Sequence, residues 1–296
     1  GDEIITSAMT CMATNEPFYN AGAKLVFADI DPETGNILAS DIEKRITDRT
    51  KAIVVVHWSG LPVDLDPVIA IAKKYNIKVV EDAAHALGAK YKNKLIGNHS
   101  DFVCFSFQAI KHLTTADGGA IVCKDKKDAE RIRKIRWFGL DRKYSERTGK
   151  SRWDQDIPES GFKMHMNNLN AAIGLEQMKY VDFIVESHIR NAKYYNQNIN
   201  NSKVKKLKQD NGSVSSYWIY SVLVDDKKDF ENYMAKNNIA TDVVHVRNDR
   251  YSVFKDFCNE KLDGLEYFEK RLMNIPVGWW LSDQDIKHIV DVVNKY

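Results

Sequence analysis

The stretch KAIVVVHW, residues 51–58, is apolar at almost every position after its first lysine. A strand with one wet face alternates apolar and polar residues, so an unbroken apolar run is typical of a strand buried on both faces of a parallel sheet. Short β-branched runs recur on both sides of it, separated by stretches with apolar residues at helical spacing. We expect strands at residues 3–6, 24–28, 52–57, 78–81, 102–107 and 119–123, and helices at 39–46 and 67–75. This alternation predicts an α/β fold, a mostly parallel sheet covered by helices.

The last third of the chain has a different pattern. Residues 168–198 are expected to form one long helix with an apolar stripe. The expected elements after it are a strand at 217–224, a helix at 229–238, a strand at 241–246 and a terminal helix with Ser282 as its N-cap. We therefore predict a large α/β domain at residues 1–185, then a linking helix and a smaller C-terminal α+β domain at residues 186–296.

Composition excludes several classes of partner. The 296 residues contain 43 Lys plus Arg and 41 Asp plus Glu, a formal net charge of +2, which offers no basic field for nucleic acid. No apolar run approaches the roughly 20 residues that span a bilayer. Four scattered cysteines lack a CxxC pair and histidines at ligand spacing, so we expect free thiols, no metal site and a cytoplasmic protein. Small molecules are the expected substrates.

Polar residues follow two of the expected strands. Asp82 ends the first, Ser106 lies at the end of the second, and Lys111 follows five residues later. Ligands of open α/β sheets bind beyond the carboxyl ends of the strands. An acid, a hydroxyl and a lysine there suit pyridoxal phosphate, which needs a protonated ring nitrogen, donors to its phosphate and a Schiff-base lysine of lowered pKa. Spacing alone leaves a solvated surface lysine as the alternative.

Six motifs, in family order, make the whole chain resemble the DegT/DnrJ/StrS-type nucleotide-sugar aminotransferases. They are GDEIIT, GAKLVFADIDPETGNI, RTKAIVVVHWSG, VEDAAHALGA, SFQAIKHLTTADGGAIV and NLNAAIGLEQ. The resemblance implies a pyridoxal-phosphate-dependent enzyme of the aspartate aminotransferase fold, fold type I.

The resemblance also implies a role for each site residue. Lys111 would be the Schiff-base lysine and proton shuttle, Asp82 the partner of the pyridinium nitrogen, and Ser106 a donor to the cofactor phosphate. His85 would lie near the cofactor ring, with a structural polar contact as its alternative. Relatives that dehydrate sugars carry His at the position of Lys111, so this lysine favours transamination. His112 is then a neighbour without a role of its own.

Three features depart from the family pattern. The chain opens at GDEIIT, so we expect it to lack the family's N-terminal Gly-Thr-x-Ala-Leu turn, which cradles the phosphate at a helix N-terminus. Cys11 stands where many members stack an aromatic ring on the cofactor. Lys163 and His165 stand in the segment that reaches the partner subunit's phosphate, often through Asn or Arg. Either would be a cationic cofactor-binding donor, and a solvated surface position is the alternative.

The implied activity is conversion of a nucleotide-linked keto-deoxy sugar to an amino sugar, with an amino acid donor that is L-glutamate in most relatives. The product would serve lipopolysaccharide or other glycan biosynthesis. Relatives are homodimers with shared sites, and residues 161–170 are expected to reach across the interface. Arg247 is a candidate for holding a substrate phosphate or carboxylate. A non-catalytic truncated homologue and a sugar dehydratase with the same cofactor remain alternatives. The residues specify neither the sugar, nor the aminated carbon, nor the nucleotide.

Overall fold

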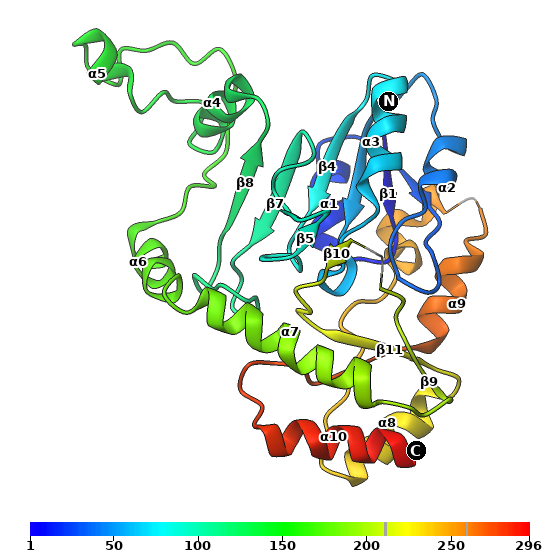
Figure 1. The fold of residues 1–296 in the computed structure, drawn as a ribbon. Helices are drawn as coiled ribbons and strands as arrows, with labels where there is room; N and C mark the ends of the chain where they lie inside the picture. The colour runs from blue at the N-terminus through cyan, green and yellow to red at the C-terminus, as the bar shows by residue number, and fades with distance from the viewer. Residues whose placement is uncertain (210–211, 259) are drawn as a thin grey trace.

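The computed structural model describes residues 1–209, 212–258 and 260–296. Its largest sheet has the strand order β2-β1-β3-β4-β7-β8 (Figure 1). The first five strands are parallel, and the edge strand β8 is antiparallel to β7. The bounds are β1 (Glu3–Ser7), β2 (Lys24–Ala28), β3 (Thr50–Val56), β4 (Lys78–Asp82), β7 (Phe102–Ser106) and β8 (Gly119–Cys123). All six expected strands are present, and the predicted α/β class is confirmed.

Strand β3 is buried on both faces because its side chains alternate between two apolar clusters. Ile53 and Val55 pack with helices α2 (Ala39–Lys44) and α3 (Leu65–Lys74). Val54 points into the cluster on the other face. Lys51 is the one exposed residue of the strand. The apolar run therefore follows from burial on both faces, as predicted.

The second face of the sheet is covered by residues from late in the chain. Phe254 of η3 (Ser252–Phe257) and Phe268 of α9 (Asp263–Arg271) pack in one cluster with residues of β1, β2 and β3. The C-terminal part of the chain thus contributes to the core of the large sheet. The division between residues 185 and 186 stays a prediction.

A second, antiparallel sheet has the order β12-β11-β9. Its strands are β9 (Val204–Lys206), β11 (Tyr220–Val224) and β12 (Leu272–Ile275), and it shares an apolar cluster with α7 (Val181–Asn198), α8 (Lys227–Lys236) and α10 (Asp283–Lys295). Ser282 caps α10 as predicted: its hydroxyl accepts from the Asp285 N–H, and the Asp285 carboxylate accepts from the Ser282 N–H.

The remaining elements are short or peripheral. They are α1 (Met12–Asn20), η1 (Trp58–Gly60), β5 (Lys90–Tyr91), β6 (Lys94–Leu95), α4 (Lys126–Ile135), α5 (Tyr144–Thr148), α6 (Asn168–Gln177), β10 (Ser213–Val214) and η2 (Asn248–Arg250). Figure 1 shows α4 and α5, in green, projecting beyond the edge strand β8. Among the described residues, no helix combines the length and the apolar character needed to cross a bilayer.

Two expectations about secondary structure are wrong. The long helix at 168–198 is two helices, because Lys179 and Tyr180 donate to carbonyls three residues back and tighten the turn between α6 and α7. Residues 241–246 form no strand. Asp242 makes one isolated β-bridge to Asn274, and the chain then turns away from the small sheet and contacts the β1–α1 turn. Helix α1 was not predicted, since it contains Pro17 and has no side-chain N-cap.

Candidate active site

Two predicted site residues end neighbouring parallel strands. Asp82 is the last residue of β4 and Ser106 the last of β7, and Asp82 pairs in register with Cys104. Both side chains therefore start from the same edge of the sheet, where α/β proteins bind ligands. The Ser106 Oγ accepts from the Gln108 N–H at 3.3 Å.

The Asp82 carboxylate is held by donors on both oxygens. The Thr14 hydroxyl donates to Oδ2 at 2.5 Å, and the Ala84 N–H donates to Oδ1 at 3.0 Å. Thr14, in the first turn of α1, also shares a 2.6 Å hydrogen bond with the Thr10 hydroxyl. Two hydrogen bonds, one to each oxygen, fix the orientation of this carboxylate. The unpredicted helix α1 thus orients the acid.

Lys111 lies in the loop between β7 and β8 and is partly buried. Burial lowers the pKa of its amine from 10.5 to about 8, against the opposing charge of Asp82. The amine nitrogen lies 3.4 Å from the centre of the Trp218 ring. The Trp218 indole N–H donates to the Ile110 carbonyl at 2.8 Å. A lysine with this pKa is in part neutral near pH 7, as a nucleophilic amine must be.

His85 is buried beside the same indole. Its ring stacks on Trp218 with centroids 4.0 Å apart, and its Nε2 lies 3.3 Å from Nε2 of His245. Burial and the nearby Lys111 charge hold the pKa of His85 well below its usual range. The same causes lower the pKa of His245 to about 4. His85 Nδ1 is buried and has no hydrogen-bond partner in the described structure. Such an atom indicates a place where a ligand can donate or accept.

His112, next to the lysine, is a packing residue. It is buried, and its ring meets that of His188 edge-to-face at 4.6 Å. Burial lowers the pKa of His112 to about 3, so the ring is neutral.

Gly119, in the motif after Lys111, allows the pairing of β7 and β8. A Cβ on Gly119 would lie 2.6 Å from the Phe105 carbonyl oxygen of the neighbouring strand β7. The close approach of β7 and β8 therefore requires glycine here.

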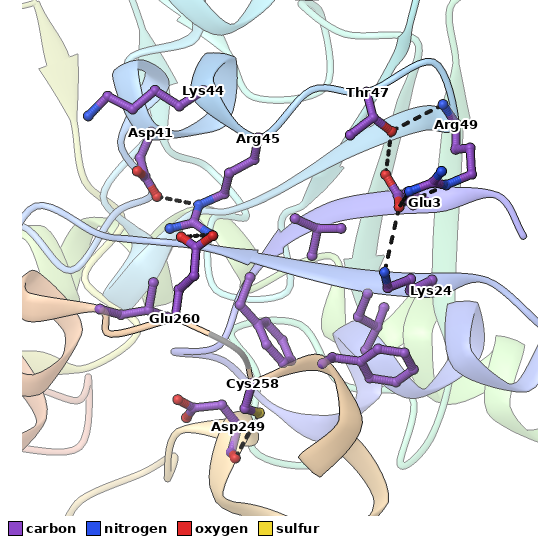
Figure 2. A pocket seen from close by; sticks show the side chains of 15 residues that line it. Glu3, Lys24, Asp41, Lys44, Arg45, Thr47, Arg49, Asp249, Cys258 and Glu260 are labelled. Atoms are coloured by element: carbon purple, nitrogen blue, oxygen red, sulfur yellow. Dashed lines mark hydrogen bonds and ion pairs between the residues drawn. The ribbon is translucent and has the colours of Figure 1, made fainter.

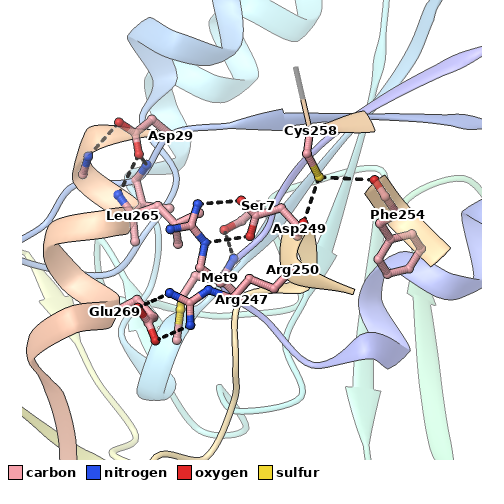
Figure 3. Close-up of polar contacts among 12 residues, drawn as sticks. Ser7, Met9, Asp29, Arg247, Asp249, Arg250, Phe254, Cys258, Leu265 and Glu269 are labelled. Atoms are coloured by element: carbon pink, nitrogen blue, oxygen red, sulfur yellow. Dashed lines mark hydrogen bonds and ion pairs between the residues drawn. The ribbon is translucent and has the colours of Figure 1, made fainter. Parts of the chain in front are cut away.

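Arg247 is ion-paired within its own segment. Its guanidinium donates to both carboxylate oxygens of Asp249, at 2.7 and 2.5 Å, as Figure 3 shows. The next residue, Asn248, is buried and donates to the carbonyls of Ala8 and Thr10, at 2.7 Å in each case. These contacts tie the segment to the β1–α1 turn and bring His245 to His85. Arg247 itself lies against Asp249.

Lys163 and His165 lie in a different part of the molecule. Lys163 is exposed, and its backbone forms an isolated antiparallel β-bridge with Trp137, which follows α4. The His165 ring packs edge-to-face on Trp137 at 4.1 Å, and its Nδ1 is buried without a partner in the described structure. These residues belong to the region of α4 to α6 that Figure 1 shows beyond β8. Their predicted role needs a second subunit and stays a prediction.

A cavity of about 400 Å³ lies at the opposite end of the sheet. Glu3 and Lys24, the first residues of β1 and β2, line it (Figure 2). Its arginines are paired: Arg45 with Asp41 at 2.6 Å and Arg49 with Glu3 at 2.6 Å. This cavity is remote from the strand ends that carry Asp82 and Ser106, so it is not the candidate site.

The cysteines are unpaired with one another in the described structure. The four cysteines carry free thiols, and burial raises the pKa of Cys104 to about 12. Within the described ranges, no three His, Cys, Asp or Glu side chains are placed to hold a metal ion. Cys11 is exposed at the N-terminus of α1, and the aromatic surface beside Lys111 comes from Trp218 and His85.

The sequence gives no role to two contributors to the site. Trp218 lies in the expected strand at 217–224, whereas β11 begins only at Tyr220. Thr14 lies on the unpredicted α1, so no local signal identifies it. His245 belongs to the run VHVRNDRY, which the sequence places near the site through Arg247, but the structure brings the histidine ring itself to His85.

Comparison with known proteins identifies the family. A model described as the DegT/DnrJ/EryC1/StrS aminotransferase family matches residues 1–294. The chain belongs to this family. One relative is GDP-perosamine synthase of Escherichia coli O157:H7, 32% identical, with 100% of this chain and 79% of the relative aligned. Another is the spore coat polysaccharide biosynthesis protein SpsC of Bacillus subtilis, 32% identical over 99% of this chain and 78% of the relative.

Solved structures of the family agree with the fold. The sugar aminotransferase CalS13 from Micromonospora echinospora superposes with a TM-score of 0.93 at 34% identity, covering 99% of this chain and 80% of that one. This chain is therefore a pyridoxal-phosphate-dependent sugar aminotransferase with the fold of that group, as the motifs predicted.

The residues present fit pyridoxal phosphate. Lys111 supplies an amine of lowered pKa, and Asp82 an oriented carboxylate at the sheet edge. His85 Nδ1 supplies a buried polar atom without a partner. The lysine and the carboxylate are two of the functions that the cofactor requires of its protein, and the Ser106 hydroxyl at the neighbouring strand end would supply the donor to its phosphate.

Proposed function

We propose that the enzyme transfers the amino group of an amino acid, with L-glutamate as the expected donor, to the ketone of a nucleotide-linked keto-deoxy sugar. In the net reaction the sugar C=O becomes C–NH₂ and the donor leaves as a keto acid. The observation that carries the proposal is a lysine of lowered pKa beside an oriented carboxylate, in a family of sugar aminotransferases. The names of the perosamine synthase and of SpsC support a nucleotide sugar and a role in polysaccharide biosynthesis.

Each residue then has a defined task. Pyridoxal phosphate, when bound, supplies an aldehyde that takes up the amino group and a ring that withdraws electrons. Lys111 holds the cofactor and, when released, takes the proton from the α-carbon of the donor. Asp82, oriented by the Thr14 hydroxyl and the Ala84 N–H, would pair with the ring nitrogen. Ser106 would donate to the phosphate, and His85 would lie near the ring.

For Arg247, a role in substrate binding requires the substrate anion to compete with Asp249 or to join the pair. An arginine guanidinium binds a phosphate through the same pair of parallel hydrogen bonds with which it binds a carboxylate. Asp249→Asn, which frees the Arg247 guanidinium, tests this role.

We further propose a homodimer in which residues 161–170 of each subunit reach the partner's site, with Lys163 and His165 as cofactor donors. Large apolar side chains on this segment and on α6 support it, because they are mostly exposed: Met164 is 71%, Leu169 79% and Leu175 70% exposed. Apolar surface of this extent on a single chain indicates a protein interface. Light scattering of the purified protein tests the stoichiometry. Mixing inactive Lys111→Ala and Lys163→Ala subunits tests the shared site, since one intact site per hybrid dimer restores activity.

An absorption titration tests the central assignment. The protein, expressed from its complete coding sequence, is titrated with pyridoxal phosphate, reduced with borohydride and mapped by mass spectrometry. A visible absorption band and a reduced adduct on Lys111 are expected, and glutamate should bleach the band. A colourless protein, or an adduct on another lysine, would refute the assignment. Mass analysis of the sugar product then separates transamination, which adds an amine, from dehydration, which only removes water.

A further inference from the structure

Trp218 lies outside the motifs that carry the family resemblance, yet it is the side chain nearest to the Lys111 amine for which the structure gives a contact. It sits between β10 and β11 and is 7% exposed. Its ring centre is 3.4 Å from the amine nitrogen, and its N–H donates to the carbonyl of Ile110, the residue before the lysine. One side chain thus holds both the backbone and the amine of this loop.

The turn that carries Trp218 is fixed from several directions. Tyr217 has a φ of +48°, a conformation that a bulky residue adopts only when its surroundings impose it. The His188 Nδ1–H donates to the Tyr217 carbonyl at 2.8 Å, and the Ser216 hydroxyl donates to the His85 carbonyl at 2.8 Å. The His85 ring stacks on the indole at 4.0 Å. The indole therefore has one defined orientation relative to the lysine.

The contact has a clear electrostatic consequence. The face of an indole ring carries partial negative charge and attracts an ammonium group, most strongly where water is excluded. Burial disfavours the charged form of Lys111, so the ring face and the Asp82 carboxylate are what stabilise that form. The other titratable groups around the amine are Cys11, His85, His112 and His245. The three histidines are neutral because they are buried, so they add no competing charge.

We propose that Trp218 is a positioning residue for Lys111. The ring face of Trp218 receives the ammonium group of the lysine whenever the lysine is not bonded to the cofactor. This proposal rests on the proposed role of Lys111. The lysine becomes positively charged when it takes a proton from the donor, and Trp218 stabilises that charge at the place where it forms. The hydrogen bond to Ile110 keeps the loop in the position from which the amine reaches the cofactor.

Fluorinated tryptophans test the ring-face contact without a change of shape. Tryptophans with one to four ring fluorines, placed at position 218, weaken the negative face stepwise and retain the N–H. The protein is converted by excess amino donor to the form in which Lys111 is free, and the pKa of Lys111 is read from pH-dependent competitive amine labelling with mass spectrometry. We expect this pKa to fall with each fluorine, by about one unit in all, a tenfold change in the ammonium-to-amine ratio.

Control experiments distinguish the ring-face contact of Trp218 from its N–H hydrogen bond, and the role of Trp218 from the proposed function of the enzyme. The same series at Trp280, 64% exposed and packed edge-to-face on Trp279, should leave the pKa of Lys111 unchanged. Trp218→Phe keeps a ring and loses the N–H, and should lower kcat about fivefold with little change in KM. If wild-type protein forms no cofactor adduct on Lys111, the proposed function fails. If the adduct forms but the pKa of Lys111 is constant across the series at position 218, the role of Trp218 is refuted.

Discussion

Replacement of Lys111 by methionine should stabilise the cofactor-free protein near neutral pH. Methionine has a similar length and no charge, so it removes the cost of burying an ammonium group and leaves the packing against Trp218 intact. The pKa of Lys111 falls from 10.5 in the unfolded chain to about 8 in the folded one, a difference of about 2.5. At about 1.4 kcal/mol per unit of pKa, Lys111→Met should raise the free energy of unfolding at pH 7 by roughly 3 kcal/mol.

The pH dependence follows from the direction of the pKa change. Between about pH 8 and 10.5 the unfolded chain keeps the Lys111 proton that the folded chain has lost. The wild type therefore gains stability as the pH rises through this window, whereas Lys111→Met does not have this gain. The advantage of the variant should shrink from roughly 3 kcal/mol at pH 7 to less than about 1 kcal/mol at pH 10.

Urea denaturation of cofactor-free protein, followed by circular dichroism at several pH values, measures this difference. Lys193→Met, at an exposed position of α7, is the matched control and should show no comparable gap. If Lys111→Met is no more stable than the wild type at pH 7, or if its advantage is the same at every pH, then the lysine is hydrated in the folded protein and its pKa is not lowered.

Two further pairs of substitutions test the supports of the site and of the core. Thr14→Val removes the hydroxyl that donates to Asp82 and should lower kcat about tenfold in steady-state kinetics. Thr14→Ser keeps a hydroxyl and should keep most of the activity. Equal losses in the two variants would contradict the role of the hydrogen bond. Gly35→Ala places a Cβ 2.7 Å from the Phe268 ring at a φ of +78° and should destabilise the protein by about 3 kcal/mol. Gly22→Ala, at a φ of +84° with open space around it, isolates the backbone strain and should cost about 1 kcal/mol in the same thermal or urea unfolding experiment.

Periodicity and strand-end chemistry were sufficient to predict the large sheet and the starting points of its site. The apolar run of β3 predicts burial on both faces, and its residues Ala52 to Val55 alternate between two apolar clusters, such as Ile53 in one and Val54 in the other. Asp82 and Ser106 end neighbouring strands because parallel strands present their carboxyl ends to one edge. These features depend on the spacing of nearby residues, which a sequence displays directly.

The tertiary structure decided the contacts between distant segments. Trp218 meets the carbonyl of Ile110 across 108 positions of the chain, and Thr14 meets Asp82 across 68. No pattern of neighbouring residues in the sequence indicates either pair, because each contact depends on where a turn or a helix packs in the folded protein. His245 leaves its sheet because the buried Asn248 finds its backbone partners in the β1–α1 turn. Hydrogen-bonding groups buried on folding must find partners wherever the packing supplies them, and that packing is a property of the whole fold.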